Sequence, residues 1–99
     1  MMAKVIFTIS YDVDPEKRDD YLALTQGMKE HFSKTNGKQY SIYEQKGKKN
    51  SFSEVFVFNS VDEYNQLDDQ DEQLTELVQK LETLVNGKMK YTTLFELEQ

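Results

Sequence analysis

The spacing of apolar residues changes repeatedly along this chain, and this change constrains the fold more than any other feature. From Lys4 to Tyr11 apolar side chains alternate, with Val5, Phe7, Ile9 and Tyr11 on one face, as in a β-strand. Similar extended segments cover 39–45, 52–59 and 88–97. Apolar residues three or four positions apart predict helices instead over 15–35, through Tyr64 and Leu67, and over 74–85. The predicted order is therefore βαββαβ, with the second helical region interrupted by an acidic run at 68–72.

The predicted helices carry recognisable end signals. Asp14-Pro15-Glu16 supplies an N-cap, a proline at the first helical position and an acidic first turn, and Asn36-Gly37 ends that helix. Ser60-Val61-Asp62-Glu63 matches a capping box. Asn86-Gly87 is predicted to stop the last helix, so that the final strand begins at Lys88. Between the two middle strands, 46–50 is a polar loop containing glycine, which indicates a hairpin.

This order predicts an α+β fold of the ferredoxin-like type. Right-handed crossovers place both helical regions on one face of a four-stranded antiparallel sheet. With 99 residues the chain is expected to form one domain over 1–99. A chain of this length buries only about 60–65 % of its unfolded surface, so further burial by association would stabilise it.

The face of the sheet without helices is predicted to be covered by a second copy of the chain. Val55-Phe56-Val57-Phe58 is apolar at four successive positions, which in an antiparallel strand implies burial from both sides. The sequence supplies no third layer, so we expect a homodimer. Since small β-branched residues suit close packing under a helix, Val55 and Val57 are predicted to face the helices. Phe56 and Phe58 are then predicted to point away from them, into the dimer interface.

The element order, the length near 100 residues and the apolar run 55–58 together resemble the dimeric α+β barrel superfamily, which includes antibiotic-biosynthesis-monooxygenase-like and EthD-like proteins. The resemblance covers nearly the whole chain and rests on architecture. It implies two ferredoxin-like protomers packed sheet against sheet, with pockets between sheet and helices. Some members are cofactor-free monooxygenases. The haem-degrading branch uses a histidine on the second helix and a nearby tryptophan, and this chain has neither.

Two residues are candidates for proton transfer. Histidine is the side-chain type whose unperturbed pKa lies near neutrality, which makes His31 a candidate, although a histidine near the end of a helix is also favoured by the helix dipole alone. Glu54 falls on the same side of its strand as Phe52, Phe56 and Phe58. A carboxyl group among aromatic rings could have a raised pKa and act as an acid or base. Pairing of Glu54 with a lysine of the 46–49 loop, or with a partner protomer, is the interpretation that we favour.

Aromatic side chains could line a ligand pocket, and Tyr21, Tyr64 and Tyr91 are candidates for binding a small apolar or aromatic molecule. No metal site and no cofactor are expected, because the chain has no cysteine and one histidine. The acidic run 68–72 does not follow the EF-hand pattern, and capping of the last helix explains it.

Composition excludes several classes of function. The net charge is −6 and no arginine-rich surface is evident, so nucleic acid is not an expected partner. No apolar run reaches membrane-spanning length and none resembles a signal peptide, which predicts a cytoplasmic protein without a membrane partner.

Two functions remain open. One is a homodimer of unknown biochemical role that binds at most a small apolar or aromatic molecule. The alternative is a cofactor-independent monooxygenase-like enzyme acting on an aromatic or polyketide-like substrate, with His31 or a tyrosine handling the proton.

Overall fold

A computed structural model describes residues 3–34, 39–65 and 72–97. The order of elements is β1 (Val5–Val13), a 3₁₀ turn η1 (Pro15–Lys17), α1 (Arg18–Lys34), β2 (Gln39–Glu44), β3 (Ser51–Phe58), α2 (Val61–Asn65), α3 (Glu72–Leu84) and β4 (Val85–Phe95). Asn36-Gly37, Leu67 and most of the acidic run at 68–72 lie outside the described residues.

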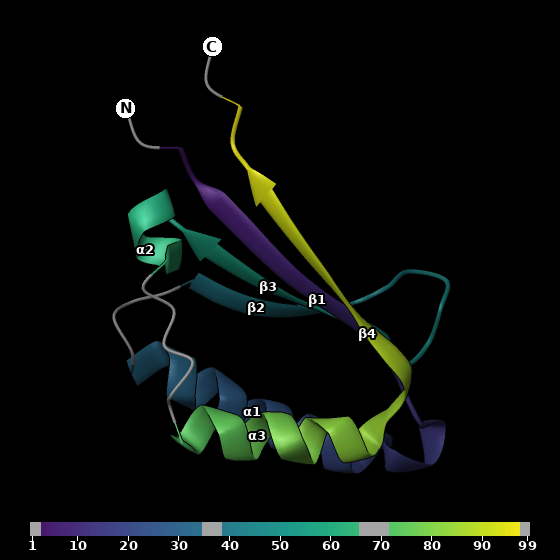
Figure 1. Ribbon diagram of the computed structural model, residues 1–99. Coiled ribbons are helices and arrows are strands. Elements are labelled where there is room, and N and C mark those ends of the chain that lie inside the picture. The colour runs from purple at the N-terminus through teal and green to yellow at the C-terminus, as the bar shows by residue number, and fades with distance from the viewer. Residues whose placement is uncertain (1–2, 35–38, 66–71, 98–99) are drawn as a thin grey trace.

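The strands form one antiparallel sheet in the order β2-β3-β1-β4. The long helices α1 and α3 lie beside one another against a single face of this sheet (Figure 1). The predicted ferredoxin-like α+β fold is therefore confirmed. The first and last strands are neighbours, and the Glu96 backbone N–H donates to the Lys4 carbonyl at 2.8 Å. In the described part of the chain, no helix is long and apolar enough to cross a membrane.

Both predicted helix caps are present. The Asp14 carboxylate accepts a hydrogen bond from the Glu16 backbone N–H at 3.0 Å, and Pro15 opens the 3₁₀ turn that leads into α1. The Ser60 hydroxyl accepts from the Glu63 backbone N–H at 3.1 Å, which is the first half of the capping box at the start of α2. The caps therefore begin these helical segments where the sequence indicates.

The boundary between α3 and β4 differs from the prediction. The helix ends at Leu84, and the strand begins at once with Val85, which pairs with Val13. Gly87 has a φ of +79° and lies next to an irregularity in the pairing of β1 with β4. Asn86-Gly87 therefore forms a bulge within the strand and not a helix stop. The β-branched Val85 gains a cross-strand partner there, which its helical spacing in the sequence does not reveal.

The predicted orientation of β3 is wrong. Phe56 and Phe58 face the helices, and Phe58 is 0 % exposed. The Phe56 ring packs edge to face on the Phe32 ring of α1, with 4.9 Å between the ring centres. The Phe58 ring packs in the same way on Tyr64 of α2, with 5.5 Å between the centres. The rings occupy the space between the sheet and the helices, so Val55 and Val57 lie on the other face. Phe56 and Phe58 are core residues, and their assignment to a dimer interface is withdrawn.

Strand pairing shows what the helix-free face carries instead. Residues directly opposite one another across antiparallel strands lie on the same face. One row across this face contains Gln39, Val57, Ile6 and Leu94, and the next contains Ser41, Val55, Thr8 and Thr92. A third contains Tyr43, Ser53, Ser10 and Lys90. Apart from Gln39 the first row of this face is apolar, the second is mixed and the third is mostly polar.

A polar network ties the start of α1 to the hairpin between β2 and β3. The Arg18 guanidinium donates to both carboxylate oxygens of Glu44, at 2.7 and 3.1 Å, and to the Asn50 side-chain oxygen at 2.8 Å. The Asn50 backbone N–H donates to the same glutamate at 2.8 Å. Arg18 also lies over the Phe52 ring, 5.5 Å from its centre. Asn50 has a φ of 69°, which asparagine tolerates better than most residues.

This network predicts a loss of stability in acid. Hydrogen bonds from Arg18 and Asn50 lower the pKa of Glu44 from 4.5 to about 2. A carboxyl with a depressed folded-state pKa stabilises the protein fully above its unfolded pKa and loses this contribution as the pH falls through the folded value. We expect the melting temperature to fall between pH 4.5 and 2, and to fall less steeply in Glu44→Gln. Parallel pH profiles of wild type and variant by circular dichroism measure the difference, and identical slopes would contradict the prediction.

Candidate functional site

A cavity of about 130 Å³ lies between the sheet and helices α1 and α3. The sheet contributes side chains from three strands and the helices close the opposite side. Its lining is Phe7, Ile9, Met28, Phe32, Glu54, Phe56, Val78, Leu81, Met89 and Tyr91. Apart from Glu54 and the Tyr91 hydroxyl these groups are apolar, so the cavity combines an apolar wall with one carboxyl group.

Glu54 is 1 % exposed. The Tyr40 hydroxyl donates a hydrogen bond to Glu54 Oε1 at 2.6 Å. Its other oxygen, Oε2, is buried and has no hydrogen-bond partner among the described residues. Buried polar atoms are nearly always paired in native proteins, so an unpaired oxygen on a residue that lines a cavity makes Glu54 a candidate for contact with a ligand.

Strand register explains why tyrosines surround this carboxyl. Glu54 lies directly opposite Ile42 of β2 and Ile9 of β1. Its diagonal neighbours on the helix-facing side are Tyr40 on β2 and Tyr11 on β1, and diagonal positions are within reach of long aromatic side chains. We did not predict Tyr40 or Tyr11 as site residues. The signal was available, since the hairpin register places both on the same face as Glu54.

Burial raises the pKa of Glu54, because removal from water disfavours the charged carboxylate. The Tyr40 hydrogen bond acts in the opposite direction and lowers it, and so does the nearby Tyr11 hydroxyl, whose own hydrogen bond is to Tyr21. The pKa values of Tyr40 and Tyr11 are themselves raised, first by burial and then by the nearby Glu54 charge. The tyrosines therefore stay protonated and can act as hydrogen-bond donors.

A second tyrosine pair extends the polar network into the core. The hydroxyls of Tyr11 and Tyr21 are 2.8 Å apart, and their rings meet edge to face at 5.8 Å. Tyr21 is fully buried and also packs on Phe52 at 4.4 Å. Burial raises the pKa of Tyr21 as well. Tyr21 therefore supports Tyr11 from α1 without lining the cavity.

The structure brings only some of the predicted site residues together. Tyr91 lines the cavity and stacks on Phe7 at 6.2 Å, and because it is 57 % exposed it lies at the cavity entrance. Tyr64 packs on Phe7, Phe58 and Phe95, outside the cavity lining. His31 is buried, but it is its neighbour Phe32 that lines the cavity.

Of the favoured interpretation of Glu54, pairing with a lysine of the 46–49 loop is wrong, and pairing with a partner protomer stays a prediction. Its hydrogen bond is to Tyr40, and Lys48 of the hairpin loop lies 3.6 Å from Asp12 instead. The alternative interpretation, a buried carboxyl with a raised pKa, is the one that the geometry supports. Strand pairing places Glu54 opposite Ile42, two rows from the last pair of the hairpin, and its side chain is buried.

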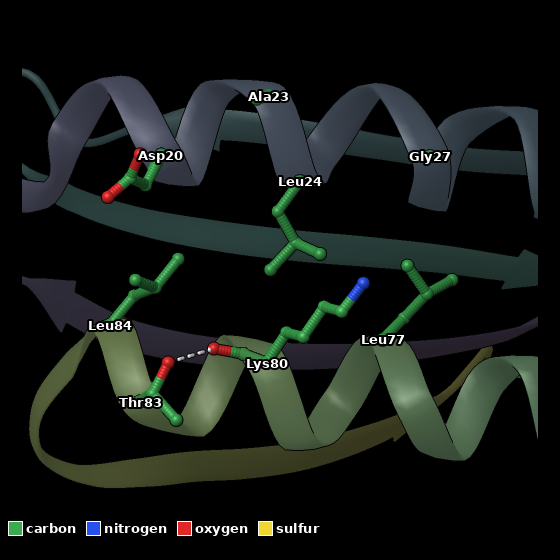
Figure 2. A pocket seen from close by; sticks show the side chains of 8 residues that line it. All are labelled: Asp20, Ala23, Leu24, Gly27, Leu77, Lys80, Thr83 and Leu84. Atoms are coloured by element: carbon green, nitrogen blue, oxygen red, sulfur yellow. Dashed lines mark hydrogen bonds between the residues drawn. The ribbon is translucent and has the colours of Figure 1, made fainter.

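A wider groove of about 490 Å³ follows the seam between α1 and α3. Figure 2 shows Leu24 of α1 facing Leu77 and Leu84 of α3, with the Lys80 side chain laid between them. The Thr83 hydroxyl donates to the Lys80 carbonyl at 2.6 Å. This groove is open and exposes charged side chains, and it offers no buried polar group. We therefore place the candidate site in the smaller cavity.

Among the residues that the structure describes, no group of three or more His, Asp or Glu side chains is arranged so that it could hold a metal ion. The expectation of a metal-free site stays a prediction. The chemistry available around the cavity is that of one carboxyl group, the tyrosine hydroxyls and apolar walls.

Neither a protein-family model nor a curated protein matches the sequence. Solved structures do match over nearly the whole chain. A conserved protein from Methanosarcina mazei Go1 has a TM-score of 0.86 at 14 % identity, covering 97 % of this chain and 95 % of that one. An antibiotic biosynthesis monooxygenase has a TM-score of 0.82 at 13 % identity, covering 95 % and 99 %. A variant of SnoaB, a cofactor-independent oxygenase from Streptomyces nogalater, has a TM-score of 0.77 at 14 % identity, covering 97 % and 95 %. The chain therefore has the fold of antibiotic-biosynthesis-monooxygenase-like proteins, as its sequence resemblance implies.

Proposed function

We propose that this protein binds a small, mainly apolar molecule in the cavity around Glu54. The observation that carries the proposal is that Glu54, which lines an apolar cavity, has a buried carboxyl oxygen without a partner among the described residues. Ligand sites typically combine apolar walls with a few polar groups that orient the ligand. A cavity of roughly 150 Å³ can hold benzene, so about 130 Å³ beside the exposed Tyr91 is close to the size of a single ring.

Toluene is a suitable first probe, because it is a small single-ring molecule without a polar group. Met28 and Met89 both line the cavity, so their methyl resonances report on its occupation. We expect toluene to shift both signals in a saturable way. In Val78→Phe, a ring added to the cavity wall should abolish the shifts. Methyl-labelled protein followed by two-dimensional NMR measures the effect.

Leu77→Phe is the matched control. Leu77 is the neighbour of Val78 on α3 but lines the outer groove and not the cavity. The added ring should leave toluene binding intact. Equal losses in both variants would indicate a general disturbance of α3, and no saturable shift in the wild-type protein would overturn the proposed function.

We also propose that two copies associate through the helix-free face of the sheet. The row of Val57, Ile6 and Leu94 supplies apolar area, with Leu94 52 % exposed in the single chain. The neighbouring row of Val55, Thr8 and Thr92 extends this area with β-branched side chains. A two-fold axis would place the same rows of both copies in contact. This interface lies opposite the cavity, so the cavity is complete within one chain.

A cofactor-independent enzyme is the second candidate function. The observation that favours it is the raised pKa of Glu54 next to Tyr40, since such a pair can exchange a proton with a bound molecule. His31, the first candidate from the sequence, is not in the cavity lining. Exchange of the methyl protons of acetophenone for deuterium, followed by NMR, tests the idea. Exchange that is faster than in buffer and is lost in Glu54→Gln would favour an enzyme.

A further inference from the structure

The two oxygens of Glu54 differ in their surroundings. Oε1 accepts the Tyr40 hydrogen bond, whereas Oε2 has no partner among the residues that the structure describes. If the carboxyl holds a proton, that proton belongs on Oε2, because Oε1 already accepts the hydrogen bond from the Tyr40 hydroxyl. The neutral acid is then a hydrogen-bond donor at the cavity wall.

The groups packed around Glu54 favour the neutral acid. Tyr11 faces it from β1 and Tyr40 from β2, with Tyr21 of α1 behind Tyr11. The side chains of α3 in the cavity lining, Val78 and Leu81, are apolar. From β4 the lining has Met89 and Tyr91, and the Tyr91 hydroxyl donates to the Met89 sulfur at 3.4 Å. None of these groups is a cation, and an ionised carboxylate without a cation is costly in such surroundings.

We infer that Glu54 donates a hydrogen bond from Oε2 to the ligand, so that the cavity selects neutral molecules with an accepting oxygen, such as a carbonyl. The inference rests on the proposed function, because it requires a ligand in this cavity. An anion would meet no positive charge, and a purely apolar molecule would leave the donor unpaired. A ligand carbonyl would instead satisfy the buried group that the protein leaves open.

Two nearly isosteric probes test this selection. Acetophenone carries a carbonyl oxygen where α-methylstyrene carries a CH₂ group, and both are single-ring molecules. We expect wild-type protein below the pKa of Glu54 to bind acetophenone roughly 3- to 10-fold more tightly than α-methylstyrene, the value of one net hydrogen bond. As the pH rises and Glu54 ionises, the preference should disappear. Shifts of the Met28 and Met89 methyl signals give both affinities.

Two variants separate hydrogen bonding from shape. Glu54→Gln keeps an oxygen for Tyr40 and a donor for the ligand, so its preference for acetophenone should persist at every pH. Glu54→Met removes the donor, so α-methylstyrene should still bind while the preference disappears. If the wild-type protein bound acetophenone and α-methylstyrene equally well below the pKa of Glu54, the inference would be overturned and the proposed function would stand. So would a pH-dependent preference in Glu54→Gln. If neither probe binds, the proposed function itself fails.

Discussion

Phe58→Ala is expected to cost about 3–5 kcal/mol of folding stability, the usual range for removing a buried phenylalanine ring. Phe58 is 0 % exposed and belongs to the cluster with Val5, Phe32 and Phe56. Its ring also packs against Tyr64, and this contact helps to hold α2 against the sheet. A domain of this size has a total stability of about 5–15 kcal/mol, so this variant is expected to unfold partly at physiological temperature. Urea unfolding at a fixed protein concentration measures the loss.

Val57→Ala is the matched control on the adjacent residue. Val57 is half-buried on the opposite face of the same strand, so its truncation should cost about 1 kcal/mol. The two variants therefore compare the two faces of β3 directly. If Val57→Ala were as damaging as Phe58→Ala, the assignment of the rings to the helix-facing side would be contradicted.

Local sequence signals were sufficient for the elements and their order. The alternation in β1, the helical spacing in α3 and the caps at Asp14 and Ser60 each depend on neighbours within a few residues. These patterns reflect periodicity and local hydrogen bonding, which the chain determines without tertiary contacts. Together with the handedness of crossovers they led to the correct architecture.

Which side chains of β3 point toward the helices could not be predicted in the same way. Val55 to Phe58 are all apolar, so alternation alone does not distinguish the two faces. The orientation depends on tertiary contacts, since the Phe56 and Phe58 rings pack against Phe32 of α1 and Tyr64 of α2. Glu54 on the same strand could have resolved the question. A carboxyl buried without a cation needs hydroxyl donors, and the hairpin register brings Tyr40 to it.

Val55→Asp is expected to dissociate the proposed dimer while leaving each chain folded. Val55 lies in the middle of β3 on the helix-free face, opposite Thr8 of the central strand β1. In a symmetric sheet-to-sheet contact the new carboxylates of both copies would be buried near one another. Like charges at an interface cost several kcal/mol, so the dissociation constant should rise about 100-fold or more. Within one chain the carboxylate stays in water, and the lower β-propensity of aspartate costs only about 1 kcal/mol.

Val55→Thr provides the control, because threonine keeps the shape and the β-branch of valine without a charge. It should leave dissociation within a few-fold of wild type, since Thr8 and Thr92 already place hydroxyls in the same row. Sedimentation equilibrium gives the mass of each protein, and far-ultraviolet circular dichroism verifies that Val55→Asp is folded. A folded Val55→Asp that remained dimeric would place the contact on another surface. A wild-type protein that sediments at 11.7 kDa would show that the valines of β3 remain exposed to solvent.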